Sequence, residues 1–507
     1  MTADELTISH ADGRVELRDD VVLDDERLYN HDLAPTRVKN RTWSTYTYAA
    51  LWISMAHCIP TYMLASGLIG TGMNWWQALV TILVGNVIVL APILLNSHPG
   101  TKYGIPFPVF ARASYGVFGA NFPAMMRAIV ACGWFGINAW IGGAALQTFF
   151  KSLWAGWPAL FGEKTPGGGI FGGHYPTEWV TFLLFWALNI LIVYRGMDLL
   201  RKVENLAAPY VLVMAALLVW WAISRAHGLG KIMSDSGKFP TFGSFWPVFV
   251  PSVTAMIGFW ATLSLNMPDF TRFGRSQKEQ AVGQVVALPA TMTVFSAMGV
   301  VITSASEKIY GKPIWDPIDL VGHFESRILI AIAMFTVVVA TLSVNIAANV
   351  VSPANDFANI APKKISFRTG GLITGIVGIL MMPWKLIADP HGYIFKWLLG
   401  YSGGLGSIAG VLICDYWLLR HKDLQLADLY KRKGAYDYGS PIGVNWNAII
   451  ATLTGCFFAW IGLLVNFLHV LFDYAWFVGA LGAAGTYFVL ERAMPQSLAR
   501  DEQAQTR

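Results

Sequence analysis

Residues 131–143, ACGWFGINAWIGG, lie in the middle of a long apolar segment. Trp134 and Asn138 are four residues apart, so on a helix they lie on the same face, one turn apart. An indole beneath a side-chain amide suits a ligand that is a small flat ring. The indole can stack on the face of the ring, while the amide donates and accepts hydrogen bonds at the edge of the ring. An amide inside a membrane is costly without a partner, which favours a functional role. In the alternative interpretation, Asn138 bonds to a neighbouring helix and Trp134 fills the core.

This apolar character extends over most of the chain. Of 507 residues, 55% are hydrophobic and 13% are charged, whereas a soluble chain carries about 25% charged residues. Runs such as 76–95 and 180–193 are long enough to form all or most of a spanning helix. The sequence therefore predicts an integral membrane protein. Its net charge of +5 gives no case for nucleic-acid binding, and the polar stretch 1–41 is not a cleavable signal peptide.

Hydropathy and helix breakers predict about twelve spanning helices. The expected spans are 44–68, 75–95, 121–150, 177–193, 205–223, 246–266, 284–303, 327–351, 370–384, 393–417, 446–467 and 472–490. Basic residues gather in alternate loops, on the side of the amino terminus. The positive-inside rule then predicts a multi-pass protein of the inner (plasma) membrane with both termini in the cytoplasm.

Two of the expected spans contain helix breakers. His57 and Pro60 interrupt the first span, and Pro251 and Gly258 interrupt the sixth. Proline removes a helix donor and glycine loosens the turn, so both can free backbone groups within the membrane. Breaks at matching places, five spans apart, favour an inverted-repeat transporter whose site lies between them. The alternative is a pair of ordinary kinked helices.

Aromatic side chains near the expected sixth break extend the candidate site. Trp260 comes two residues after Gly258, and Phe259 precedes it. Tryptophans on two different helices can sandwich a planar ring from both faces. The alternative is that Trp260, one of 21 tryptophans, belongs to the core or to an interfacial belt.

The eighth expected span carries polar residues in an apolar helix. Asn345 and Asn349 are four residues apart, and Ser343 adds a hydroxyl. Asn349 is the second candidate for an amide that reads the ring edge. Ser343, with backbone carbonyls of Ala340 and of the broken first helix, can form an oxygen cage for a cation. Alternatively, these small polar residues let the helices pack closely.

The ionisable residues do not suggest an enzyme. Asp269, Arg272 and Asp415 lie at predicted helix ends, where they suit loop-anchoring or gating pairs. His57 is the only ionisable group near the first break, as a titrating group or as a hydrogen-bonded pore-lining histidine. The sequence has no phosphate-binding loop, no HExxH motif and no nucleophile elbow, so it predicts no enzymatic activity and no cofactor.

Several stretches, taken in order, resemble one transporter family. They are GTKYGIPFPVFARASYG (100–116), CGWFGINAWIGG (132–143), NMPDFTRF (266–273), NIAANVVSPA (345–354) and MMPWK (381–385). The chain is similar to the nucleobase:cation symporter-1 family of hydantoin, allantoin and uracil permeases, and most similar to its bacterial allantoin-permease branch. The resemblance implies an all-α, leucine-transporter-like fold with two inverted five-helix repeats and two further carboxyl-terminal helices. The implied units are a tail (1–43), the repeats (44–223 and 246–417), the terminal helices (446–490) and a second cytoplasmic tail (491–507).

The resemblance also implies roles for individual residues. Trp134 and Trp260 match the pair that clamps the ring, Asn349 matches the amide at its edge, and Leu398 matches a gate residue on the tenth helix. The sodium-site positions of the hydantoin branch are matched by Ser54, His57, Ala340, Ser343 and Val344.

Two positions depart from the family pattern. Asn138 stands where members of the hydantoin and allantoin branches carry glutamine, so its reach is one methylene shorter. Val344 stands where the sodium-dependent member has threonine, so one hydroxyl ligand is missing. The coupling ion is therefore left open between Na⁺ and H⁺.

The expected function is secondary-active symport. A cation gradient would drive import of a small planar cyclic amide, such as uracil, hydantoin, allantoin or a related nucleobase, by alternating access in the lipid bilayer. A monomer is expected to suffice. The alternative is a sodium-coupled amino-acid or osmolyte transporter on the same fold, and a channel is disfavoured because aromatic residues close the site.

Overall fold

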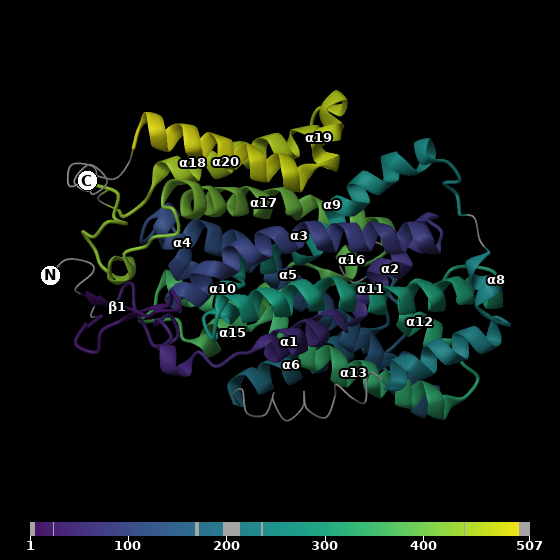
Figure 1. Cartoon of the computed structure of the whole chain (residues 1–507). Helices are drawn as coiled ribbons and strands as arrows, with labels where there is room; N and C mark the ends of the chain where they lie inside the picture. Colours follow the sequence, from purple (N-terminus) through teal and green to yellow (C-terminus); the bar gives the residue numbers. More distant parts are fainter. Residues whose placement is uncertain are drawn as a thin grey trace.

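The computed structural model describes residues 6–23, 25–167, 172–195, 213–234, 237–440 and 442–495. Long helices run side by side along one direction, and the first and last described segments of the chain lie at the same end of the bundle (Figure 1). We call this end the terminal end and the other the opposite end. Eight described segments are long and apolar enough to cross a membrane. They are α3 (Trp75–Tyr103), α5 (Asn121–Leu153), α6 (Pro176–Arg195), α9 (Phe242–Asn266), α11 (Gln277–Tyr310), α13 with α14 (Arg327–Asn349 and Val351–Ile360), η4 to η5 through α17 (Gly392–Leu398, Leu399–Ile413 and Cys414–Leu419), and α18 with η7 (Trp446–Trp460 and Ile461–Leu463).

Further apolar helices complete the predicted set. Two bent pairs have the length of a span, and two shorter helices are apolar. The pairs are α1 with α2 (Thr45–Ala56 and Ile59–Thr71) and η8–α19 with α20 (Asn466–Asp473 and Ala475–Ala493); the short helices are Val213–Arg225 and α15 (Phe367–Leu380). Each of the twelve predicted spans overlaps one of these segments. Residues 205–212 of the fifth predicted span lie outside the described residues.

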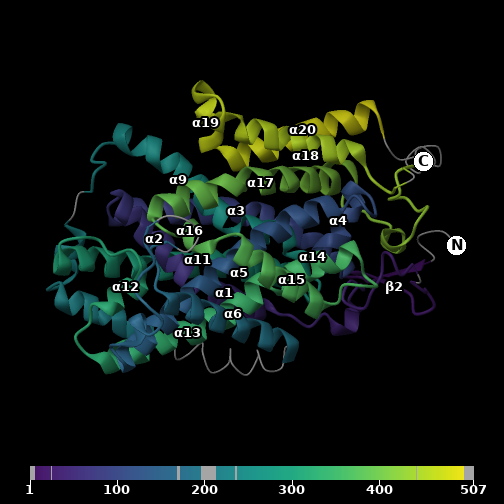
Figure 2. The same ribbon diagram turned by 180° about the vertical axis from the view of Figure 1, so that it is seen from behind.

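Short elements precede and connect these helices. They are β1 (Thr7–Ser9), β2 (Val15–Leu17), η2 (Val38–Asn40), α4 (Phe107–Tyr115), η3 (Trp157–Ala159), α8 (Leu229–Met233), α10 (Pro268–Thr271), α12 (Pro317–Gly322), α16 (Pro383–Leu386) and η6 (Leu426–Tyr430). From behind, α18 and α20 lie together on one flank, over α17 (Figure 2). Helix α5 lies within the bundle and packs against α13, α6, α15 and α14. The stretch that carries Trp134 and Asn138 is therefore central.

The predicted break in the first span is confirmed. Helix α1 ends at Ala56 and α2 begins at Ile59, with an angle of 57° between them. Cys58 between them is extended, with φ −138° and ψ 159°, and Pro60 lies in the first turn of α2, where its missing N–H costs nothing. The Tyr393 hydroxyl donates to the Pro60 carbonyl over 3.1 Å.

The predicted break in the sixth span is wrong. Helix α9 runs without interruption from Phe242 to Asn266, through Pro247 and Pro251. Gly258 serves another purpose, because a Cβ at this position would lie 2.5 Å from the Leu398 carbonyl oxygen. The glycine thus lets α9 approach the π-helical turn η4. A break that we did not predict lies near Tyr474, where α19 and α20 meet at 86°.

The amino-terminal segment is folded onto the terminal end. Strands β1 and β2 pair antiparallel. The backbone of Trp43 bonds to that of Phe273 and Arg275 over 2.9 and 3.0 Å. Arg41 is 2% exposed and donates to the carbonyls of Val15, Thr36, Thr101 and Lys102.

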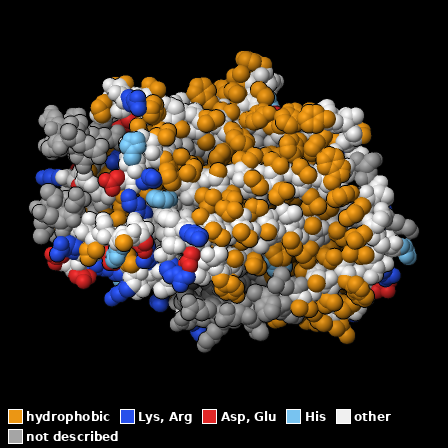
Figure 3. Space-filling view, viewed as in Figure 1, with side chains coloured by type: hydrophobic (Ala, Val, Ile, Leu, Met, Phe, Trp, Pro, Cys, Tyr) orange, Lys and Arg blue, Asp and Glu red, His pale blue; other side chains and the backbone are white. Residues whose placement is uncertain are grey.

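The surface divides by side-chain type. Hydrophobic side chains cover the middle of the bundle, whereas most Lys, Arg, Asp and Glu side chains in this view lie toward the terminal end (Figure 3). An apolar belt with charges at one end is the surface expected of a protein embedded in lipid.

Candidate functional site

The candidate site begins with the Trp134 side chain on α5. Its indole is 7% exposed, and Nε1 donates to the Tyr401 hydroxyl over 3.2 Å. That hydroxyl donates in turn to the Gly258 carbonyl over 2.7 Å. Tyr401, on α17, therefore ties α5 to α9 through one polar group. Sequence reasoning missed this residue.

Phe259 links the two predicted tryptophans. Its ring lies 5.2 Å from that of Trp134 and 4.9 Å from that of Trp260, edge-on in both cases. Trp260 also meets Trp52 of α1 edge-on, at 5.1 Å. The structure thus gathers the indoles from α5 and α9 around one phenyl ring. Within the described chain, the two indoles are connected through this ring rather than by a direct ring contact.

The tenth span closes this aromatic group from another side. Trp397 lies 6.2 Å from Trp134 and 4.9 Å from Tyr401, and Tyr393 lies 6.2 Å from Trp134. Leu398, the predicted gate residue, is fully buried at the end of η4, with its backbone against Gly258. The aromatic residues at 393, 397 and 401 are spaced four residues apart and therefore share one helix face. This spacing is the signal in the sequence that could have identified Tyr401.

The two predicted edge amides are buried. Asn138 is 3% exposed, and its Nδ2 donates to the Trp134 carbonyl over 3.1 Å. Asn349 is 9% exposed, and its Nδ2 donates to Asn345 Oδ1 over 3.0 Å. Asn345 donates to Asn189 Oδ1 over 3.1 Å and to the Phe135 carbonyl, beside Trp134, over 3.4 Å. Asn345 therefore connects Asn349 with the helix that carries Trp134.

The predicted cation positions lie where α1 ends and on α13. Ser54 is partly buried, and the His57 ring rests 4.4 Å from that of Phe295. His57 and Ala340 both line an apolar cavity of about 340 Å³. On α13, Ser343 and Val344 are 6% and 9% exposed.

These residues suit a hard cation only in part. Ser54 and Ser343 offer hydroxyl oxygens, whereas Val344 offers none, so a Na⁺ ion here would depend on backbone carbonyls. Within the described residues, no three His, Cys, Asp or Glu side chains group as metal ligands. The cation site stays a prediction.

A second polar network joins α9, α10 and α14 at the terminal end. Asn266 donates to Ser352 Oγ over 2.7 Å, and Ser352 Oγ donates to Asp269. Asp269 also accepts from the backbone N–H of Phe107 over 2.8 Å. Arg272, which we expected to pair with such a carboxylate, donates instead to the Asp32 carbonyl over 2.9 Å. Both residues thus anchor loops, but through separate partners.

One buried ion pair lies beside this network. Arg127 of α5 and Asp356 of α14 are 1% and 0% exposed in their side chains, and Nη1 and Oδ2 lie 3.1 Å apart. Asp415, predicted as a loop anchor, is also buried and accepts from Arg420, Ser114 and Tyr487. The charged residues of this end hold elements together instead of lining the aromatic site.

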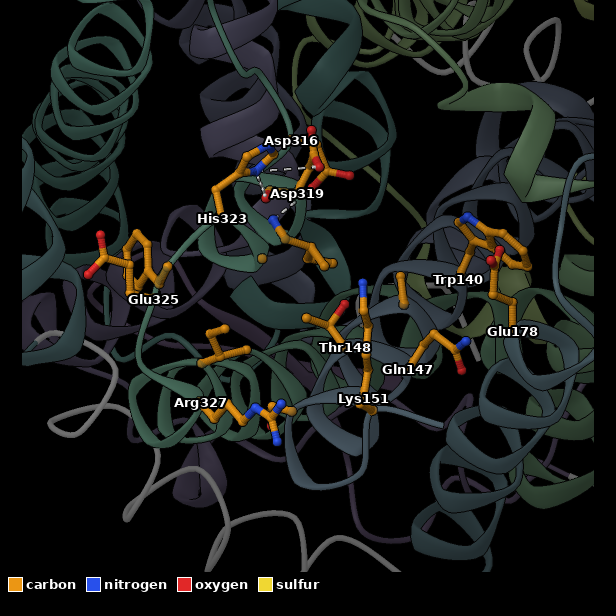
Figure 4. Close-up of a pocket in the computed structure, with 17 residues that line it drawn as sticks. Trp140, Gln147, Thr148, Lys151, Glu178, Asp316, Asp319, His323, Glu325 and Arg327 are labelled. Carbon is orange, nitrogen blue, oxygen red and sulfur yellow. Dashed lines mark hydrogen bonds and ion pairs between the residues drawn. The ribbon is translucent and has the colours of Figure 1, made fainter. Parts of the chain in front are cut away.

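A separate cavity of about 650 Å³ lies at the opposite end (Figure 4). Asp316, Asp319 and His323, in and around α12, gather on one side of it, and Gln147 and Lys151 of α5 on the other. None of the candidate substrate residues lines it.

The pKa of Asp316, in the cavity at the opposite end, predicts that the thermal stability of the protein depends on pH. Burial raises the pKa of Asp316 to about 6, and the charge of Asp319 acts in the same direction, against the hydrogen bond from the Ile318 N–H. The pKa of Asp316 in the folded protein lies above the ordinary value of an aspartic acid. The contribution of this carboxyl group to the stability of the fold is therefore complete at low pH and is lost as the pH rises through about 6. We expect the melting temperature of the wild type to fall relative to that of Asp316→Asn between about pH 4 and pH 7. Parallel curves for the two proteins would contradict this assignment.

Comparisons with known proteins show similarity to one family of permeases. A family model described as permeases for cytosine/purines, uracil, thiamine and allantoin matches residues 35–479. The allantoin permease of Bacillus subtilis (strain 168) is 43% identical over 471 residues, which cover 92% of this chain and 94% of that protein. The purine-uracil permease NCS1 of Arabidopsis thaliana is 38% identical over 479 residues, which cover 92% and 78% of the two chains.

A solved structure shares the fold. The inward-facing conformation of Mhp1 superposes with a TM-score of 0.73 at 25% identity, over 94% of this chain and 97% of that one. This match confirms the predicted fold class, an all-α membrane protein with the leucine-transporter-like arrangement of two inverted five-helix repeats.

Proposed function

The chain belongs to the family of permeases for cytosine and purines, uracil, thiamine and allantoin, and on this premise we propose that it imports a small planar cyclic amide. Members of this family are transporters and not enzymes. Uracil, hydantoin and allantoin are the substrates of this kind that we would test first. The relatives named above are permeases for allantoin and for purines and uracil, which supports this choice.

The observation that carries the proposal is the pair of indoles around Phe259, with buried amides on α5 and α13. Trp134 and Trp260 come from different helices and meet the same ring, at 5.2 and 4.9 Å. Indoles stack on flat rings, and offset stacking adds roughly 0.5–1.5 kcal/mol per pair beyond the burial of area. Asn138 and Asn349 supply polar contacts for the ring edge. We propose that these four side chains, with Phe259 and Leu398, bind the substrate.

A cation gradient drives import in this proposal. Either Na⁺ or H⁺ is the coupling ion, and the predicted Na⁺ site comprises Ser54, His57, Ala340, Ser343 and Val344. Residues 44–223 and 246–417 form the two repeats that rearrange during alternating access, and 446–490 form the terminal helices. We place the terminal end in the cytoplasm of a cell whose plasma membrane holds the protein, since basic residues gather there. The protein acts as a monomer.

A sodium-coupled carrier of amino acids or osmolytes is the second candidate. Such ligands carry charged ends, which free backbone groups or ions must meet, whereas the described site offers indoles and neutral amides. The fold alone does not separate the two candidates, but the named permease relatives favour the first.

Uptake into proteoliposomes tests the proposal. The purified protein is given labelled uracil, hydantoin and allantoin, with a Na⁺ gradient, with a pH gradient and with neither. We expect saturable uptake of at least one ring, driven by one of the two gradients. Competition by glycine or betaine with no uptake of any ring would favour the second candidate.

A further inference from the structure

An apolar cavity of about 340 Å³ lies beside the break in the first span. Its walls come from the break with α2, from the helix Val213–Arg225, and from α11, α12 and α13. The first two of these parts fall in the first proposed repeat, and the other three fall in the second. The cavity therefore lies between the two repeats, in the half of the bundle toward the opposite end (Figure 1).

The walls of this cavity offer little to a polar ligand. The Thr336 hydroxyl donates to the Ile332 carbonyl over 2.8 Å, and the Tyr62 hydroxyl lies 3.3 Å from that of Thr303. The described residues that line the cavity include no Asp, Glu, Lys or Arg. Apolar cavities exclude water, and a void leaves the wall atoms without dispersion contacts. The cavity therefore suits an apolar occupant.

The walls continue into the apolar belt on the surface. Leu217, Trp220 and Leu329 line the cavity and are exposed, whereas Ile302 and Val321, which also line it, are buried. The cavity thus reaches from the surface of the belt to the core. In a bilayer, the groups that meet exposed apolar side chains at this level are the acyl chains of lipids.

We propose that the cavity binds one acyl chain of a bilayer phospholipid, which enters past Leu217, Trp220 and Leu329. The chain fills the gap between the repeats and ends against the first break, at His57 and Cys58. The headgroup stays at the membrane surface, because the walls offer it neither a carboxylate nor a Lys or Arg side chain.

This site goes beyond the proposed function, because none of the side chains proposed to bind the substrate lines the cavity. Alternating access moves the repeats against each other. A lipid chain bound between them is therefore part of the interface that rearranges.

Photo-cross-linking of the full chain in proteoliposomes tests the proposal. One probe is a phosphatidylcholine with a diazirine in an acyl chain, and the control probe carries the diazirine on its headgroup. Mass spectrometry measures labelling of Tyr62 and Met298, which line the cavity, relative to Phe457, which is exposed on α18. We expect the acyl probe, and not the headgroup probe, to label the two cavity residues. Labelling of Phe457 alone, or equal labelling of the cavity by both probes, would overturn the proposal.

A cavity-filling variant supplies a second test. Ala333 lines the cavity, whereas Ala331, on the same helix, is partly exposed and is not among the lining residues. Ala333→Phe adds a phenyl ring to the wall, and Ala331→Phe is the matched control. Since a filled cavity has no room for a chain, we expect the ratio of Tyr62 to Phe457 labelling to fall at least about fivefold in Ala333→Phe and to persist in Ala331→Phe. Equal ratios in the two variants would contradict the assignment.

Competition separates a lipid chain from a transported ring. Unlabelled uracil, hydantoin and allantoin are added to the wild-type sample before irradiation, and we expect labelling of Tyr62 and Met298 to stay unchanged. Loss of this labelling would assign the cavity to the ring and overturn the proposal. Every readout here is independent of uptake, so a failure of the proposed function and a failure of the lipid site remain distinguishable.

Discussion

Replacing Trp134 by alanine is expected to raise the KM for ring uptake by about 30- to 150-fold. The change removes a stacking face and the area that it buries, together worth about 2–3 kcal/mol, and each 1.4 kcal/mol is a factor of ten. It also removes the side chain that Phe259, Tyr393 and Trp397 contact edge-on. Labelled uptake over a range of substrate concentrations measures the effect.

Two conservative variants separate stacking from hydrogen bonding at this position. Trp134→Phe keeps an aromatic face but loses the bond from Nε1 to Tyr401. Tyr401→Phe removes the same bond and also the bond from the Tyr401 hydroxyl to the Gly258 carbonyl. One such bond contributes about 0.5–1.5 kcal/mol, so Trp134→Phe should raise the KM by about 2- to 12-fold, and less than Trp134→Ala does. A wild-type KM in Trp134→Ala, at equal protein amounts, would remove Trp134 from the site.

Removing the buried cation Arg127 should be the most destabilising single change that we consider. Arg127→Met leaves the Asp356 carboxylate, which is 0% exposed, without its partner. Breaking a buried pair in this way costs about 3–5 kcal/mol, whereas replacing both partners by apolar residues is often neutral. The double variant Arg127→Met/Asp356→Leu should therefore recover much of the lost stability.

Thermal unfolding in detergent measures these effects. The matched control is Arg368→Met, which removes an exposed arginine at the start of α15. Two results would contradict the argument: a melting temperature of Arg127→Met equal to that of the control, or a double variant less stable than Arg127→Met.

Local sequence patterns predict the spans and one of the two expected breaks. The first span is interrupted next to Pro60, which lies in the first turn of α2, where a proline without an N–H is best tolerated. The same reasoning fails for Pro251, because α9 continues through it. At Gly258, the absent side chain makes room for Leu398, and a close approach between helices has no signature in the nearby sequence.

The parts of the site that local patterns miss depend on distant partners. Tyr401 meets Trp134 across 267 residues, and Asn189 meets Asn345 across 156. Each is a single polar group in an apolar run, so spacing within its own helix says nothing about its partner. Trp134, Asn138 and Asn349 are candidate site residues because pairs of polar and aromatic residues one turn apart are visible within one helix, and their role in binding stays a prediction.

The docked amino-terminal segment constrains the order in which the protein is assembled. Leu33 and Trp43 are synthesised hundreds of residues before their partners Tyr430 and Phe273. Contacts so distant along the chain close late in folding. Leu33 and Trp43 are thus held in place only after the segments that contain Tyr430 and Phe273 have been made.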